Sequence, residues 1–127
     1  MMTRILMVDD SEIDRLIVER MLAKAEPNTS FLGLNSFEHF KNWMRDNELT
    51  GSAICFVDLN LPDIKGYDLV SYVESTFPKK FDAIKFYILS ASPQRRDKDL
   101  VDKLSNIEAF LTKPIDIQTL RNIVQSN

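Results

Sequence analysis

Residues 53–66 have the sequence Ala53-Ile54-Cys55-Phe56-Val57-Asp58-Leu59-Asn60-Leu61-Pro62-Asp63-Ile64-Lys65-Gly66. The apolar residues before Asp58 show no helical period and include β-branched and aromatic side chains. This pattern is typical of a strand that is covered on both faces in a parallel sheet. Asp58 would then lie at the carboxyl end of the strand. Because ligands of open α/β sheets bind at that edge, Asp58 is a candidate site residue.

Three other apolar segments also end at polar residues. We predict a strand at each: Ile5–Val8 before Asp9 and Asp10, Phe86–Leu89 before Ser90, and Ala109–Thr112 before Lys113. If these strands are parallel neighbours, their acids, hydroxyl and lysine converge at one edge of the sheet. Each residue taken singly is equally compatible with an ordinary turn or helix cap, so it is their coincidence that indicates a site.

Helical patterns alternate with the strands. A short strand is expected at Ser30–Leu34, and helices are expected after Ser11, after Ser36, from Gly66 to Pro78, from about Arg95 to Ser105, and after Asp116. Five strands alternating with five helices predict an α/β fold: a flavodoxin-like, doubly wound parallel sheet in the order 2-1-3-4-5. We expect Lys79–Asp82 to be a polar connector.

Length and composition limit the class of protein. The 127 residues, 44% of them hydrophobic, are typical of one globular domain, residues 1–127. The net charge of −3 and the pI of about 5.1 argue against nucleic acid as a direct partner. The apolar start, Ile5–Val8, is too short for a signal-peptide core or a membrane span. The only cysteine, Cys55, cannot form an internal disulfide. We therefore expect a cytoplasmic protein without a membrane partner.

The predicted site has a definite chemistry. Crowded carboxylates raise one another's pKa, so Asp9, Asp10 and Asp58 require a cation, and Mg²⁺ or Mn²⁺ suits oxygen ligands. One carboxylate can then act as a nucleophile towards a phosphoryl donor, while Lys113 and Ser90 hold the phosphoryl oxygens. Asp9 and Asp10 are adjacent, as a ligand pair would be, so the solitary Asp58 is the better acceptor.

With these residues in order at successive strand ends, the chain resembles, from end to end, the receiver domain of the two-component response regulators. The resemblance implies that Asp58 is phosphorylated from a phosphohistidine of a sensor histidine kinase or a histidine phosphotransfer protein. It also implies that Asp10 and Asp58 ligate Mg²⁺ directly, Asp9 through water, and Asn60 through its backbone carbonyl. The Lys113-Pro114 bond is expected to be cis.

The resemblance further implies a switch that changes which downstream target protein is bound, with slow self-dephosphorylation and no other enzymatic activity. Ser90 stands where threonine is commoner, and Phe110 stands where many receivers have a tyrosine. We expect Ser90 and Phe110 to move together on phosphorylation and to shift an equilibrium in the helix from Arg95 to Ser105. Only Leu100, Val101 and Leu104 make up the apolar side of that helix, so we expect it to be loosely held.

Two other classes of protein share parts of this pattern. A magnesium-dependent phosphohydrolase would also use an aspartyl phosphate, a metal and a lysine, but such enzymes begin with Asp-x-Asp on the first strand and carry a substrate cap. A flavin carrier on the same fold would need a loop rich in Ser, Thr and Gly after the first strand, where Asp9 and Asp10 stand instead. The only histidine, His39, lies in an expected helix away from the strand ends, which argues against a zinc site or a Ser-His-Asp hydrolase.

The first helix has more apolar residues than one buried stripe requires. At about 100° per residue, one arc contains Ile17, Val18, Met21 and Leu22. Ile13 and Leu16 lie beyond its edge, and we expect both to be exposed beside the acidic crevice. Scattered surface hydrophobes are normal, yet a phosphohistidine donor needs a contact surface there, so we interpret Ile13 and Leu16 as partner-docking residues.

Overall fold

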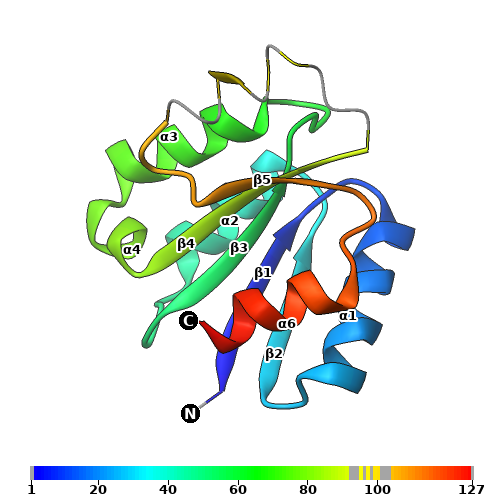
Figure 1. Ribbon diagram of the computed structural model, residues 1–127. Coiled ribbons are helices and arrows are strands. Elements are labelled where there is room, and N and C mark those ends of the chain that lie inside the picture. Colours follow the sequence, from blue (N-terminus) through cyan, green and yellow to red (C-terminus); the bar gives the residue numbers. More distant parts are fainter. Residues whose placement is uncertain (1, 92–94, 96, 98, 101–103, 127) are drawn as a thin grey trace.

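The computed structural model describes residues 2–91, 95, 97, 99–100 and 104–126 (Figure 1). Its strands are β1 (Thr3–Val8), β2 (Thr29–Leu34), β3 (Ala53–Asp58), β4 (Ile84–Ser90) and β5 (Ala109–Thr112). The helices of this part of the chain are α1 (Glu12–Ala25), α2 (Phe37–Asp46), α3 (Gly66–Thr76), α4 (Pro78–Asp82) and α6 (Ile117–Gln125). All strand pairs are parallel, in the order β2-β1-β3-β4-β5, which confirms the predicted flavodoxin-like fold.

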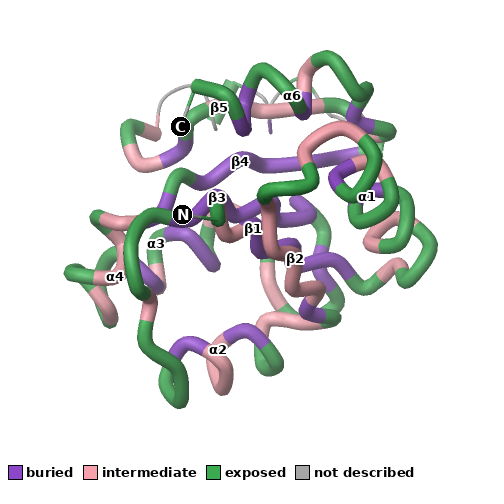
Figure 2. The backbone as a smooth tube through the Cα atoms, turned by 90° about the horizontal axis from the view of Figure 1, so that it is seen from below, coloured by how far each residue is buried: buried purple, intermediate pink, exposed green. Residues whose placement is uncertain are grey.

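Helices cover both faces of the sheet. On one face, Val18 and Leu22 of α1 share a buried cluster with Leu120 of α6. On the other face, Phe40 of α2 and Leu69 of α3 belong to a second cluster. All six residues of β3 are buried, as expected for a strand covered on both sides. Figure 2 shows the buried residues concentrated in the central strands and on the inward sides of the helices.

Side-chain caps begin three of the helices where the sequence predicts them. The side chains of Ser11, Ser36 and Asp116 each accept a hydrogen bond from the backbone N–H three residues further on, at 3.2, 3.1 and 2.8 Å. Each cap satisfies one of the N–H groups that a helix leaves without an internal partner. The starts of α1, α2 and α6 therefore follow from local sequence.

The expected polar connector Lys79–Asp82 is instead part of a short helix, α4. Pro78 ends α3, but proline is also favoured in the first turn of a helix, and here it begins the next one. The ammonium group of Lys80 donates to the backbone carbonyls of Met44 and Asn47, at 2.8 Å for Asn47. These carbonyls belong to the carboxyl end of α2, so α4 caps a helix that lies more than 30 residues earlier in the chain.

Part of the helix expected from Arg95 to Ser105, including Val101 of its apolar side, lies outside the described residues. Of the residues described there, Arg95, Asp97, Asp99 and Leu100 are helical. Leu104 and Ser105 are not helical, so the prediction that the helix extends to Ser105 is wrong. Among the residues described, no helix combines the length and the apolar character that crossing a membrane requires.

Candidate functional site

The predicted site residues do meet at the carboxyl edge of the sheet. Asp9 and Asp10 follow β1, Asp58 and Ser90 are the last residues of β3 and β4, and Lys113 follows β5. Asp9, Asp58 and Ser90 are buried, whereas Asp10 is exposed. The Lys113-Pro114 peptide bond is cis, as the resemblance implied.

The ammonium group of Lys113 lies among three carboxylates. Its Nζ is 2.6 Å from Oδ2 of Asp9, 3.0 Å from Oδ2 of Asp14 and 3.3 Å from Oδ2 of Asp58. Asp14 stands three residues after Ser11, the spacing of a reciprocal helix cap, and it was not among the predicted site residues. The structure places it in the site instead, because the backbone N–H of Ser11, which a reciprocal cap would use, donates to Oδ1 of Asp9 at 2.9 Å.

Burial and charge shift the pKa values of this group in opposite directions. Burial raises the pKa of Asp58 above its ordinary value, and the backbone N–H of Asn60 and the charge of Lys113 only partly offset this effect. Burial alone would lower the pKa of Lys113, but its contacts with Asp9 and Asp14 and the charge of Asp58 raise it. Lys113 therefore stays positively charged, whereas burial makes the ionised form of Asp58 less favourable than it is in water.

The carboxylate oxygens of Asp9, Asp10 and Asp58 are ligands of the kind that a hard cation requires. One carboxylate oxygen from each lies within 4.8 Å of the others. Oδ2 of Asp9 is buried, and the ammonium group of Lys113 lies 2.6 Å from it. Crowded carboxylates are unfavourable unless their charge is neutralised, and a divalent cation would add positive charge beyond that of Lys113. The residues present therefore suit Mg²⁺ or Mn²⁺.

The side chain of Arg15 supports the loop that carries Asp9. Nη1 of Arg15 donates to the backbone carbonyl of Asp9 at 2.5 Å. The side chain of Arg15 reaches this carbonyl across Gly33 of β2, where an added Cβ would lie 2.9 Å from Cδ of Arg15. A residue without a side chain at position 33 therefore leaves room for the arginine that supports the loop.

The loop after β3 is tied to a distant helix. Oδ1 of Asp58 accepts from the backbone N–H of Asn60 at 3.1 Å, and Asn60 forms an isolated bridge with Lys65. Between them, the carboxylate of Asp63 accepts from the N–H groups of Phe37 and Glu38 at the start of α2, both at 3.2 Å. Asp63 thus anchors the segment that contains Asn60, a role that no local sequence signal predicts.

Ser90 and Phe110 lie on the same side of the sheet. Ile88 pairs with Phe110 and Ser90 with Thr112, so by the alternation of a strand these side chains share one face. Phe110 is partly buried against the cluster formed with α2 and α3. The predicted movement of Ser90 and Phe110 stays a prediction.

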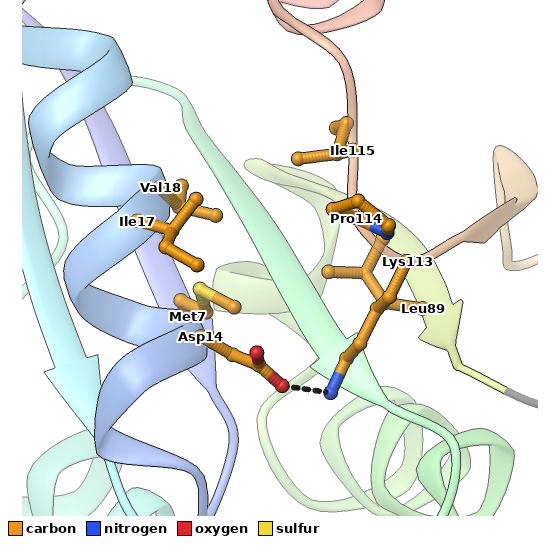
Figure 3. A pocket seen from close by; sticks show the side chains of 8 residues that line it. All are labelled: Met7, Asp14, Ile17, Val18, Leu89, Lys113, Pro114 and Ile115. Carbon is orange, nitrogen blue, oxygen red and sulfur yellow. Dashed lines mark hydrogen bonds and ion pairs between the residues drawn. The ribbon is translucent and has the colours of Figure 1, made fainter.

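The exposure expected on α1 is confirmed for Ile13, at 70%, and for Leu16, at 41%. Ile17 was expected on the buried arc, and that prediction is wrong, because its exposure is also 41%. The buried residues of α1 are Val18 and Leu22, so the buried arc is narrower than the apolar pattern suggests. A cavity of about 20 Å³, room for one water molecule, lies between α1 and Lys113–Ile115 (Figure 3).

Comparisons with known protein families agree with this geometry. The sequence model of the family described as the response regulator receiver domain matches residues 5–125. A two-component response regulator of Oryza sativa subsp. japonica is 27% identical over 98% of this chain and 56% of its own length. A stress response regulator protein of Clavispora lusitaniae is 26% identical over 90% of this chain and 57% of its own length. The chain thus spans just over half the length of these relatives.

Solved structures show the same fold. A two-component response regulator from Cytophaga hutchinsonii superposes with a TM-score of 0.86, at 19% identity, over 98% of this chain and 96% of that one. A response regulator receiver protein from Dyadobacter fermentans gives a TM-score of 0.85 at 22% identity, with the same coverage. At these identities the likeness concerns the fold alone.

Proposed function

Because the chain belongs to the response regulator receiver domain family, we propose that it is a phosphorylation-controlled signalling switch whose phosphoryl acceptor is Asp58. The observation that carries the proposal is the contact between Asp58 and Lys113, 3.3 Å apart beside Asp9 and Asp10. The donor would be a sensor histidine kinase or a histidine phosphotransfer protein in the cytoplasm, and the output a downstream target protein. Neither nucleic acid nor a membrane would be a direct partner.

The residues of the chain divide the chemistry between them. An oxygen of Asp58 attacks the phosphorus atom of a phosphohistidine, the new O–P bond forms as the N–P bond breaks, and the imidazole of the donor leaves. Lys113 neutralises one phosphoryl oxygen, and the hydroxyl of Ser90 donates to another. Hydrolysis later breaks the O–P bond and restores the carboxylate. The buried position of Asp58 limits the access of water to the acyl phosphate.

Asp9, Asp10 and Asp58, with the backbone carbonyl of Asn60, would hold Mg²⁺ or Mn²⁺. The bound ion would supply positive charge to the phosphoryl oxygens during transfer. The proximity of these three carboxylates, with one oxygen of each within 4.8 Å of the others, supports this assignment. Asp10→Ala should weaken metal binding sharply in a calorimetric titration, and an unchanged titration would remove the ion from this crevice.

Incubation with acetyl phosphate and Mg²⁺, followed by intact-protein mass spectrometry, tests the acceptor. The wild type should gain one phosphoryl group, and Asp58→Asn should gain none. Asp68→Asn, which alters an exposed acid of α3, is the matched control and should be labelled normally. Uptake by Asp58→Asn at the wild-type rate would contradict the assignment. Repeated release of phosphate, many times per protein molecule, would instead support a phosphohydrolase.

The switch is proposed to involve Ser90 and Phe110, whose side chains share one face of the sheet next to α3. Phosphorylation would draw the Ser90 hydroxyl towards the phosphoryl group and allow Phe110 to move into the space released. Hydrogen exchange of β4 and β5 should therefore differ between the two phosphorylation states. Identical exchange in both states would contradict the switch.

Ile13 and Leu16 are proposed to contact the phosphoryl donor, since both are exposed on α1 near the crevice. Leu16→Glu should slow transfer from the kinase without slowing labelling by acetyl phosphate. Met2→Glu is a suitable control, because Met2 is an exposed apolar residue at the opposite end of β1. Equal transfer rates for wild type and Leu16→Glu would show that the donor binds elsewhere.

A further inference from the structure

We propose that Asp14 is a positioning residue that competes with the phosphoryl group for Lys113 and thereby opposes the phosphorylated state. The inference rests on the proposed function of Asp58. Asp14 lies in the first turn of α1, and its carboxylate points across the small cavity to Lys113 (Figure 3). Their contact, at 3.0 Å, is shorter than the one between Lys113 and Asp58, at 3.3 Å.

The carboxylate of Asp14 is directed to Lys113 rather than to its own helix. The side chain of Ser11 accepts a hydrogen bond from the N–H of Asp14. The N–H of Ser11 donates to the carboxylate of Asp9, so it is not available to the carboxylate of Asp14. Among the interactions of the described residues, the partner of the Asp14 carboxylate is Lys113, which lies 99 residues away. With 36% of its side chain exposed, Asp14 is not forced into this position by burial.

The number of hydrogen-bond donors creates the competition. An ammonium group has three N–H donors, and three carboxylates already lie within 3.3 Å of Nζ of Lys113. The acyl phosphate on Asp58 carries about −1.5 to −2 charges in place of the single charge of the carboxylate, and it adds three strong acceptors. Acceptors then outnumber donors. An N–H group of Lys113 that donates to Asp14 therefore cannot donate to a phosphoryl oxygen.

The charge of Asp14 has the opposite effect on a cation. Before phosphorylation, three carboxylates share one ammonium group, and the excess negative charge attracts Mg²⁺. The other walls of the cavity beside the pair include the apolar side chains of Met7, Val18 and Leu89. These walls reduce the screening of the Asp14 charge by water. Asp14 should therefore strengthen metal binding and weaken binding of the phosphoryl group.

The test measures both effects on Asp14→Asn, which keeps the shape of the side chain and removes its charge. Beryllofluoride, a tetrahedral mimic of the phosphoryl group, is titrated at a Mg²⁺ concentration that saturates both the wild type and the variant, and is followed by ¹⁹F NMR. Mg²⁺ alone is titrated by calorimetry. Because the ion pair between Asp14 and Lys113 is only partly exposed, we expect beryllofluoride to bind about twofold to fivefold more tightly and Mg²⁺ to bind more weakly by a similar factor.

Opposite changes in the two affinities distinguish this role from a structural one, since a disturbed fold would weaken both. Glu12→Gln is the matched control, because it removes an exposed acid from the same helical turn and should change neither affinity by as much as Asp14→Asn. Asp14→Glu should restore both affinities towards the wild type. Unchanged affinities, or two changes of the same sign, would overturn the inference. If the wild type itself binds no beryllofluoride, it is the proposed function of Asp58 that fails.

Discussion

Gly66 lies close to the backbone at the end of β3, and Gly66→Ala should disturb the acceptor directly. A Cβ at position 66 would lie 2.7 Å from the backbone carbonyl oxygen of Asp58 and 3.1 Å from Cα of Leu59. These atoms belong to the end of β3, and the N–H of Gly66 donates to the carbonyl of Leu59 at 2.8 Å. The methyl group therefore fits only if α3 moves away from the sheet or the end of β3 shifts.

The expected loss of stability follows from this clash. Overpacking by one methyl group costs about 1–3 kcal/mol, and we expect the upper part of that range because the obstacle is backbone. For a chain of this size, about 4 °C per kcal/mol gives a fall in Tm of about 4–12 °C. Labelling of Asp58 by acetyl phosphate should also slow, since the acceptor is displaced from Lys113.

Gly33→Ala is the matched comparison in urea unfolding. There the added Cβ meets Cδ of Arg15, at 2.9 Å, which is part of a flexible side chain. Replacing glycine by alanine within a strand gains about 0.5–1 kcal/mol, which offsets the cost of moving Arg15. We expect Gly33→Ala to be near the wild type in stability. A fully stable Gly66→Ala, or equal losses in both variants, would refute the distinction between backbone and side-chain obstacles.

Three further predictions concern buried and capping groups. Burial raises the pKa of Asp58, so the folded state binds more protons than the unfolded state between the two pKa values, and stability falls as pH rises through that window. Asp58→Asn should therefore be more stable than the wild type at about pH 7, and its advantage should shrink near pH 4 in urea unfolding; an advantage that grows on acidification would contradict this. Burial also raises the pKa of the Cys55 thiol, so a thiol reagent should modify it only after unfolding, and rapid labelling of the native protein would count against the structure. Asp63→Ala should cost about 1 kcal/mol and speed amide exchange at Phe37 and Glu38, whereas unchanged exchange would show that Asp63 does not cap α2.

The parts of the fold that could be predicted depend on signals within a few residues of one another. The apolar run before Asp58 predicts a doubly covered strand, and Ser11, Ser36 and Asp116 cap the helices that follow them. The carboxyl ends of parallel strands lie at the same edge of a sheet. The proximity of the acids to Lys113 therefore also follows from sequence. Helix α4 does not, because five residues show no period and a proline can end one helix or begin another.

The parts that could not be predicted depend on partners far apart in the chain. The spacing of Ser11 and Asp14 is explained by a local cap, and nothing in it points to Lys113. Asp63 lies in a segment with the composition of an ordinary turn. Its carboxylate nevertheless accepts hydrogen bonds from the start of a helix about 25 residues earlier. Ile17 lies on the apolar arc of α1, but the width of the buried part of that arc depends on how the helix sits against the sheet.

The central place of β1 has a consequence for synthesis of the chain on the ribosome. β1 pairs with β2 on one side, but its partner on the other side, β3, begins about 50 residues after it. At about 5–20 residues per second, that edge of β1 waits roughly 2.5–10 s for β3 to be made. An unpaired strand edge is a template for pairing with other chains. A nascent chain halted after α2 should therefore expose this edge of β1 to other chains, and the appearance of residues 53–58 should remove it.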